Sequence, residues 1–319
     1  MNNDMIHFYD LHPPMADFKQ EVLDGLQTQP KVLSPKFFYD KKGSVLFDQI
    51  TELPEYYPTR TELDILQTHC DEMAALLGDD CLLVELGSGS SQKIRTLLQT
   101  VKPAAYMPMD ISKQHLLDAA QTLSQDYPDL EIHATCADYS SDFDLPYSPE
   151  HLSRAAFFPG SSIGNFEPQH AKALLKRVAK SLDSEGKLLV GVDLKKEAGV
   201  LNAAYNDKQG VTAAFNLNLL DRINRELEAN FDLEYFSHHA FYNETQGRIE
   251  MHLVSQAQQK VSVGKQGFQF SEGETIHTES SYKYSISQFH QLAQEAGFEA
   301  IQSWTDEQDL FSVHCLQVK

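Results

Sequence analysis

The sequence predicts an α/β fold built on a parallel, doubly wound β-sheet. Apolar strand-like runs alternate with amphipathic helix-like segments from residue 61 to residue 194. The first of these runs ends in a Gly-x-Gly turn that leads directly into a helix. The alternation stops after residue 194 and resumes at residue 286, where one helix and two final strands complete a predicted sheet of seven strands.

The elements of this sheet follow one another in a regular order. Strands are predicted over 82–84, 106–109, 131–139, 155–158, 187–194, 300–304 and 311–316. Helices are predicted over 61–77, 113–127, 168–182 and 286–296. The helix after the glycine turn is expected to be capped by Ser90 or Ser91 and to bury Ile94, Leu97 and Leu98.

Two stretches lie outside the alternation. Residues 1–60 are rich in aromatic and turn residues, with a turn expected over 40–43, a short helix over 44–50 and an ordered, non-helical segment over 55–57 between two prolines. Tyrosines beside prolines suit either simple packing or a lid whose phenols bind a small polar substrate. Residues 195–285 contain one predicted long helix, 210–229, and strand-like segments at 233–242, 248–255, 267–270 and 275–279.

Composition and charge exclude several classes of protein. The formal net charge of −20 argues against nucleic acid or an anionic membrane as a partner. No apolar run approaches the roughly 20 residues of a membrane span, and the N-terminus lacks the pattern of a signal peptide. The four cysteines are scattered, so we expect a cytoplasmic protein without a metal or a disulfide. We also expect a monomer.

The Gly-x-Gly turn lies in the stretch 81–98, CLLVELGSGSSQKIRTLL. Gly87 and Gly89 permit a tight turn and allow a ligand to approach the backbone closely. A dinucleotide fingerprint would have a third glycine where this chain has Gln92. Glu85 instead completes an E-x-G-x-G pattern, which suits S-adenosylmethionine because that molecule has no pyrophosphate. The motif favours S-adenosylmethionine, while a dinucleotide site and an ordinary strand–helix turn stay open.

Further candidate ligand-binding residues fall at the carboxyl ends of the predicted strands, where such sheets bind ligands. Asp110 follows the glycine turn by about twenty residues, the spacing of a carboxylate that accepts ribose hydroxyls; it could also cap a helix. Asp138 could contact the ligand or form a turn. Lys93 opposes the dipole of its helix unless it meets an anion, such as the methionine carboxylate, or is simply solvated.

Over nearly its whole length the chain resembles the L-histidine Nα-methyltransferases of ergothioneine biosynthesis. The resemblance rests on SPKFFYDKKGSVLFDQITELPEYYPTRTE, VELGSGSSQKIRTLL, PGSSIGNF, GVDLKKE, AAYNDKQGVTAAFNLNLLDRINREL, RIEMHL and IHTESSYKYS. It implies a seven-stranded, Rossmann-like S-adenosylmethionine-dependent methyltransferase domain formed by residues 61–194 and 286–319. Residues 1–60 and 195–285 would form a second, α+β substrate-binding domain.

The resemblance also implies roles for individual residues. The cofactor site would comprise Gly87, Lys93, Asp110, Asp138 and Tyr139. In the substrate site, the α-amino and carboxylate groups of the amino acid would be held by Tyr56, Asn165 and Tyr205, with Tyr39 close to the amine, and the imidazole would be held by Glu279 and Ser281, with Met251 lining its pocket. Ser280 and His252 depart from the family pattern beside these residues, which leaves the preferred amino acid open.

The implied reaction is the transfer of three methyl groups to the α-amine of L-histidine, giving a trimethyl betaine, hercynine. The amine must be neutral and in line with the leaving sulfur, and neither a metal nor a covalent nucleophile is required. A buried Glu279 would select an imidazole N–H, because another side chain would leave its charge unpaired; Glu279 could instead be an acid at a strand end. Alternatives are methylation of tryptophan or a thiolated histidine, a non-catalytic S-adenosylmethionine-binding regulator, and a dinucleotide oxidoreductase.

Overall fold

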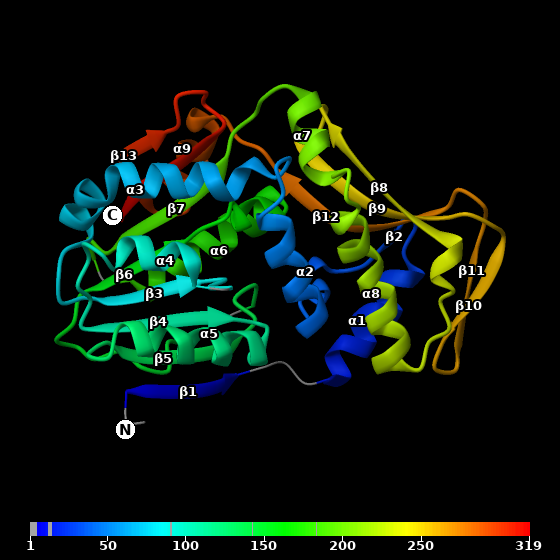
Figure 1. Ribbon diagram of the computed structural model, residues 1–319, viewed down its shortest axis with the longest axis horizontal. Helices are drawn as coiled ribbons and strands as arrows, with labels where there is room; N and C mark the ends of the chain where they lie inside the picture. Colours follow the sequence, from blue (N-terminus) through cyan, green and yellow to red (C-terminus); the bar gives the residue numbers. More distant parts are fainter. Residues whose placement is uncertain (1–4, 12–14, 90, 142, 183) are drawn as a thin grey trace. The chain divides into compact units, whose positions relative to one another are not determined.

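A computed structural model describes residues 5–11, 15–89, 91–141, 143–182 and 184–319, which form two compact units (Figure 1). Unit 1 comprises the described residues of Met1–His12, Pro58–Lys195 and Tyr282–Lys319. Unit 2 comprises those of Pro13–Tyr57 and Lys196–Ser281. None of the described helices is both long and apolar enough to cross a membrane.

Unit 1 contains an eight-stranded sheet in the order β1-β5-β4-β3-β6-β7-β14-β13. Its strands are β1 (Ile6–Leu11), β3 (Leu82–Leu86), β4 (Ala105–Asp110), β5 (Glu131–Ala137), β6 (Arg154–Phe158), β7 (Lys187–Asp193), β13 (Phe298–Thr305) and β14 (Phe311–Val318). In this spatial order, each strand from β1 through β5, β4, β3 and β6 to β7 is parallel to its neighbour. β14 is antiparallel to both β7 and β13. The seven predicted strands are therefore all present.

The additional strand, β1, corrects the expectation that all of residues 1–60 belong to the second domain. It pairs in parallel with β5 at the edge of the sheet. Its sequence, IHFYDL, is only partly buried and lacks the continuous apolar run that marks a central parallel strand. A strand of this kind cannot be recognised without its partner.

Helices cover both faces of this sheet, as the doubly wound prediction requires. They are α3 (Tyr57–Leu77), α4 (Gln92–Leu97), α5 (Lys113–Asp126), α6 (Pro168–Ser181) and α9 (Ile286–Glu295). Side chains of α3, α4 and α5 share one buried cluster with the sheet, and those of α6 and α9 share the other. The predicted non-helical segment 55–57 ends one residue early, because α3 begins at Tyr57 and Pro58 occupies its first turn, where no N–H is needed.

Unit 2 has the mixed α and β content that the sequence predicts. Its helices are α1 (Met15–Gln27), η1 (Pro35–Phe38), α2 (Lys41–Thr51), α7 (Ala198–Tyr205), α8 (Val211–Leu227) and η3 (Leu233–Tyr235). A four-stranded sheet has the order β2-β12-β9-β8, and β10 and β11 form a hairpin. These strands are β2 (Lys31–Val32), β8 (Phe236–Asn243), β9 (Arg248–Ser255), β10 (Gln259–Val263), β11 (Gln266–Phe270) and β12 (Thr275–Tyr282).

One local prediction in unit 2 is wrong. The stretch 40–43 was expected to be a turn, but α2 begins at Lys41 and Asp40 is its N-cap. The Asp40 carboxylate accepts a hydrogen bond from the Gly43 N–H at 2.7 Å, which satisfies one of the first-turn donors of the helix. The apolar face predicted for the long helix is present, since Phe215, Leu219, Ile223 and Leu227 of α8 are buried.

Candidate active site

The glycine turn at the end of β3 leaves room for a ligand against the backbone. Gly87 and Gly89 have φ values of +70° and +50°, and the Gly87 N–H donates to the Met109 carbonyl at 2.8 Å. A Cβ on Gly87 would lie 3.1 Å from the Tyr139 hydroxyl, whereas nothing lies within 4 Å of the position of a Cβ on Gly89. The buried Ser88 hydroxyl has no hydrogen-bond partner among the described residues. The turn thus offers both open space and an unsatisfied polar atom, which fits a bound cofactor.

Asp110, at the end of β4, fastens this turn. Its carboxylate accepts hydrogen bonds from the Gly89 N–H at 3.0 Å and from the Ser112 N–H at 2.8 Å. Ser112, rather than Asp110, occupies the N-cap position of α5. Burial raises the pKa of Asp110, because a charged carboxylate loses solvation there.

Asp138 and Tyr139 follow β5 at the same edge of the sheet. The Asp138 carboxylate accepts a hydrogen bond from the Ser140 N–H at 2.9 Å, so it forms a turn of the kind that was one of its two predicted roles. The Tyr139 ring packs edge-on against Phe158, with 5.7 Å between centroids. Burial also raises the pKa of the Tyr139 hydroxyl, which therefore stays a neutral hydrogen-bonding group beside Gly87.

Of the two alternatives left open for Lys93, an anion or solvent, the structure shows an anion, and that anion belongs to the protein. Its Nζ lies 2.7 Å from Oε2 of Glu62, whose side chain is fully buried. The Glu62 carboxylate also accepts the Gly160 N–H at 2.8 and 3.0 Å. A Cβ at Gly191 of β7 would lie only 2.0 Å from Glu62 Oε1, so the glycine makes room for this carboxylate. Lys93 is consequently held in place rather than solvated.

Glu85, the acid of the E-x-G-x-G pattern, is buried next to Tyr106. The Tyr106 hydroxyl donates a hydrogen bond to the Glu85 carboxyl group. Burial, opposed by this hydrogen bond, raises the pKa of Glu85 to about 8. At pH 7 the buried Glu85 side chain is therefore largely in its neutral, protonated form.

The expected capping of α4 is not made by Ser91. Ser91 occupies the N-cap position, but its backbone is left-handed, with φ of +57° and ψ of +22°, and its side chain makes no capping hydrogen bond. The predicted cap geometry requires an extended backbone at this position. The alternative candidate, Ser90, lies outside the described residues. The apolar face of the helix is as predicted, since Ile94, Leu97 and Leu98 are buried.

Asn165 ends η2 (Ser162–Asn165), the short helix that follows β6 at this edge of the sheet. One hydrogen bond and one close approach between backbone segments fix the position of this loop. The Asp193 N–H of β7 donates to the Ser161 hydroxyl at 2.9 Å. A Cβ on Gly164 would lie 2.6 Å from the Tyr282 carbonyl oxygen. Unit 1 therefore brings the predicted cofactor residues and Asn165 to the carboxyl ends of β3, β4, β5 and β6.

The predicted tyrosines of unit 2 form a continuous aromatic cluster. Tyr39 packs edge-on against Phe47 and Phe215, at centroid distances of 5.7 and 5.8 Å. Tyr56 packs edge-on against Phe47 at 6.4 Å and Tyr205 at 6.3 Å. The aromatic segment of residues 1–60 is therefore joined to α7 and α8 by ring contacts, with Tyr56 and Tyr205 side by side.

The backbone around Tyr39 is anchored by its neighbour Asp40. Besides capping α2, Asp40 accepts a hydrogen bond from Asn218 Nδ2 of α8 at 2.9 Å and pairs with Arg225. These interactions lower the pKa of Asp40, against the opposing effect of burial. The carboxylate thus fixes the junction between η1 and α2 against α8, and with it the ring of Tyr39.

Tyr205 is positioned by contacts of α7 with β8. Asn202 Oδ1 accepts the Tyr242 N–H at 2.6 Å, and Asn206 Nδ2 donates to the Ala240 carbonyl at 3.0 Å. The buried Tyr205 hydroxyl donates to the Ser281 hydroxyl at 2.9 Å. Two residues that the resemblance implied for substrate binding therefore contact each other directly.

The strand that carries Glu279 and Ser281 departs from regular alternation. The Ser280 hydroxyl lies 3.2 Å from His277 Nε2, although residues three apart in a regular strand point to opposite faces. Thr278 and Ser281 likewise both contact helices, Thr278 through Asn216 of α8 at 2.7 Å and Ser281 through Tyr205 of α7.

Met251 and Glu279 belong to the two central strands of this sheet. The Met251 carbonyl accepts a hydrogen bond from the Thr278 hydroxyl at 3.1 Å, and the Met251 side chain is fully buried. Glu279 is 9% exposed, which contradicts the alternative that it is a surface acid at a strand end. A carboxylate at this depth must be balanced by hydrogen-bond donors.

Sequence reasoning missed some residues that position the site. Glu62, which holds Lys93, and Asp40, which anchors the backbone at Tyr39, were not singled out, and neither was Ser88, whose hydroxyl is unsatisfied at the glycine turn. Glu62 could have been recognised, because it precedes Ile65 and Leu66 by one helical turn and so lies on the apolar face of its helix. The roles of Ser88 and Asp40 depend on tertiary contacts that leave no pattern in the sequence.

Comparison with known proteins gives consistent matches over most of the chain. Residues 18–318 match a family model described as histidine-specific methyltransferase, SAM-dependent. A histidine N-alpha-methyltransferase of Mycolicibacterium smegmatis is 43% identical over 294 residues, which cover 90% of this chain and 91% of that protein. The protein of the same name from Mycobacterium tuberculosis is 42% identical, with 91% of each chain covered. Ergothioneine biosynthesis protein 1 of Neurospora crassa is 30% identical over 86% of this chain and 32% of that protein.

Proposed function

Because the chain belongs to the family of histidine-specific, S-adenosylmethionine-dependent methyltransferases, we propose that it methylates the α-amino nitrogen of L-histidine. Three successive transfers give the trimethyl betaine hercynine. The observation that carries the choice of substrate is the buried Glu279, two residues from Ser281 on β12. A buried carboxylate gains a charge-assisted hydrogen bond from an imidazole N–H, and a substrate side chain without such a donor forgoes that bond.

S-adenosylmethionine supplies a methyl group activated on a sulfonium, and unit 1 provides the residues to hold it. The backbone of Gly87 and the open space above Gly89 accommodate the molecule at the end of β3. The Asp110 carboxylate accepts hydrogen bonds from backbone N–H groups, among them those of Gly89 and Ser112, and we assign its remaining acceptor capacity to the ribose hydroxyls. Lys93 has three donors, one of which pairs with Glu62, and the others are available to the methionine carboxylate.

The remaining contacts of the cofactor are assigned to Asp138 and Tyr139, at the adenine. Tyr139 is suited to this role because its ring is held by Phe158 and its hydroxyl lies beside the glycine turn. Asp138 follows β5 beside Tyr139, and a carboxylate is a suitable acceptor for the exocyclic amine of adenine.

The amino-acid substrate is assigned to the neutral hydroxyl and amide groups of the site. Tyr56, Tyr205 and Asn165 hold its amino and carboxylate groups, and Tyr39 lies close to the amine. The amine must lose its proton before it attacks, since an α-ammonium is mostly protonated at pH 7. Phenol and amide groups orient the amine by hydrogen bonding without adding a negative charge that would favour the ammonium. They can therefore accept the unmethylated, monomethylated and dimethylated forms in turn.

The other end of histidine is assigned to Glu279 and Ser281, with Met251 lining the ring pocket. The hydrogen bond from Tyr205 to Ser281 joins the residues proposed for the two ends of the substrate. That link gives the site a means of fixing the distance between the α-amine and the imidazole. A misplacement of about 1 Å in such a site can reduce the rate a hundredfold.

Mass spectrometry of the product tests this function. The full chain is incubated with S-adenosylmethionine and, in separate reactions, histidine, tryptophan, 2-thiohistidine and the remaining common amino acids. We expect histidine to gain one, two and finally three methyl groups. A preference for tryptophan or the thiolated histidine would replace the substrate assignment, and the absence of any methylated amino acid would refute the enzymatic function. In the same preparation, the cofactor is identified by whether S-adenosylmethionine or NAD raises the melting temperature of the protein.

A further inference from the structure

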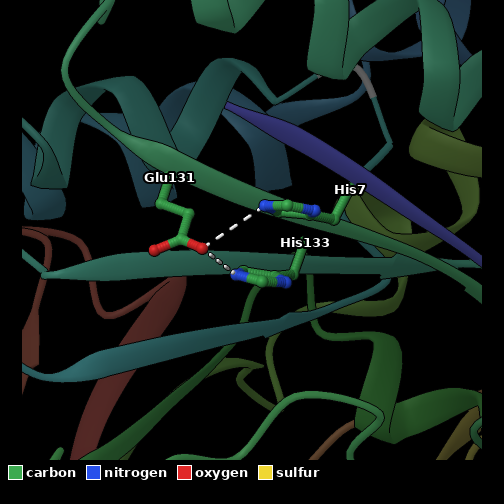
Figure 2. A group of neighbouring side chains, drawn as sticks. All are labelled: His7, Glu131 and His133. Carbon is green, nitrogen blue, oxygen red and sulfur yellow. Dashed lines mark hydrogen bonds and ion pairs between the residues drawn. The ribbon is translucent and has the colours of Figure 1, made fainter. Parts of the chain in front are cut away.

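Two histidines and a glutamate converge at the edge of the unit 1 sheet, where β1 pairs with β5. His7 lies directly opposite His133 in the parallel register of these strands. His7 Nε2 is 3.4 Å and His133 Nε2 is 3.1 Å from the same oxygen, Oε1 of Glu131. Figure 2 shows the two imidazoles turned toward that carboxylate. The ligand atoms all lie within 4.8 Å of one another.

The spacing of these atoms suits a small divalent cation. Zinc binds imidazole nitrogen and carboxylate oxygen at about 2.0–2.2 Å in tetrahedral geometry, which separates neighbouring ligand atoms by roughly 3.3 Å. The nitrogen-to-oxygen distances of 3.1 and 3.4 Å are close to that separation. The imidazoles stack with 17° between their planes, so the exposed His7 ring must turn for both nitrogens to face one ion.

The buried ligand of the trio is already oriented by its surroundings. The His133 side chain is 2% exposed, and its Nδ1 lies 3.1 Å from the Tyr9 hydroxyl. The ring of Tyr147 stacks on His133 with centroids 3.6 Å apart. A hydrogen bond on the second ring nitrogen is the usual support for a ligating histidine.

We propose that His7, Glu131 and His133 form a zinc-binding site that fastens β1 to the edge of the sheet, with water completing the coordination. His7 and Glu131 are 45% and 34% exposed, so the fourth position faces solvent. The ligands come from two neighbouring strands, and one of these, β1, is held in the sheet on one side only. The site is independent of the methyl-transfer reaction.

A second trio, Glu250, His252 and His277 of unit 2, is less suited to a cation. Glu250 already receives hydrogen bonds from Arg248 at 2.9 Å and Asn243 at 3.0 Å. His277 Nε2 lies 2.8 Å from the Glu279 carbonyl oxygen. In the described part of the chain, by contrast, the ion pairs of Glu131 are with His7 and His133. The group formed by His7, Glu131 and His133 is therefore the better candidate for a cation site, and the second group provides a control.

Zinc binding to the full chain, first treated with a chelator and then dialysed, tests the proposal. Isothermal titration with zinc chloride is expected to show one site per chain, and His7→Ala and Glu131→Gln are each expected to weaken the affinity at least tenfold. Both changed side chains are partly exposed, so these variants should fold. Tyr9→Phe is expected to weaken the affinity about tenfold through the orientation of His133, and His252→Ala should leave it unchanged.

Hydrogen exchange provides a second readout that does not depend on activity. Zinc is expected to slow amide exchange in residues 6–11 of the unmodified chain and to have no such effect in His7→Ala. A plain hydrogen-bonded arrangement, in which both imidazoles donate to Glu131, predicts instead no stoichiometric zinc binding. That result, or binding that survives both His7→Ala and Glu131→Gln, would overturn the proposal.

Discussion

The Glu62 carboxylate and the Lys93 ammonium lie 2.7 Å apart, with the carboxylate completely buried. The same carboxylate binds the Gly160 N–H, so one side chain of α3 joins the helix after the glycine turn to the loop after β6. Two segments that we assign to the cofactor and the substrate are thereby held by a single buried acid.

Glu62→Gln should destabilise unit 1. A glutamine keeps one acceptor oxygen, but it carries no charge to balance that of Lys93, and breaking a buried pair costs about 3 kcal/mol. Urea denaturation followed by fluorescence measures this loss. Asp64→Asn, an exposed change from acid to amide on the same helix, serves as the control and should lie within about 0.5 kcal/mol of the unmodified protein. Equal effects of the two changes would contradict the role assigned to Glu62.

Gly87→Ala should lower stability and weaken the binding of S-adenosylmethionine. The left-handed backbone at this position costs a residue with a Cβ about 1–2 kcal/mol, and the new methyl group would lie 3.1 Å from the Tyr139 hydroxyl. Chemical denaturation and titration calorimetry measure the two effects. Gly199→Ala, at an open position within α7, should be neutral or slightly stabilising.

A double-mutant cycle separates the crowding at Gly87 from the backbone strain. In a Tyr139→Phe background the hydroxyl is gone, so Gly87→Ala should cost less than it does in the unmodified chain. If the cost is the same in both backgrounds, the Tyr139 hydroxyl does not restrict this position.

The buried Glu85 should make stability fall as the pH rises. Its pKa is raised from 4.5 to about 8 by burial, so between these values the folded protein binds more protons than the unfolded chain. The free energy of unfolding then decreases with increasing pH, by up to about 1.4 kcal/mol per pH unit from this group. Between pH 5 and pH 8, the free energy of unfolding of Glu85→Gln should decline less steeply with pH than that of the unmodified protein. An exposed change that removes no titratable group, Gln121→Ala on α5, should leave the slope unaltered.

Tyr205→Phe should weaken histidine binding with a modest loss of stability. The change removes the hydrogen bond to the Ser281 hydroxyl, a loss of about 1 kcal/mol, and takes away a hydroxyl oxygen that we assign to the substrate. Steady-state kinetics should show a higher KM for histidine and an unchanged KM for S-adenosylmethionine. Tyr235→Phe, at a side chain that is 49% exposed, is the control. A rise in both KM values would instead indicate a general disturbance of the fold.

Glu279→Ala should reduce the affinity for histidine about a hundredfold, since the imidazole N–H loses its charged acceptor, worth about 3 kcal/mol. Titration calorimetry in the presence of S-adenosylhomocysteine measures this change. Glu272→Ala, an exposed glutamate in the same unit, should bind histidine normally. Unchanged affinity in Glu279→Ala would refute the assignment of the imidazole site.

Much of unit 1 could be predicted because its signals are local. The continuous apolar runs of β3 to β7 and the glycines after β3 follow from burial on both faces and from the backbone required at a tight turn. The side chains grouped after β3, β4, β5 and β6 were also expected, since parallel strands end at one edge of the sheet. β1 could not be found in this way, because an edge strand half exposed to water has no distinctive pattern.

By itself, the sequence determined the α/β class, the cofactor turn and the helical face of α8, since each depends on residues a few positions apart. Only the tertiary structure decided which partner Lys93 meets, how deeply Glu279 is buried, and that His7 faces His133 across two strands. The physical reason is that ion pairs, burial and strand register depend on segments distant in the chain, and those segments are brought together only by the packing of the whole unit.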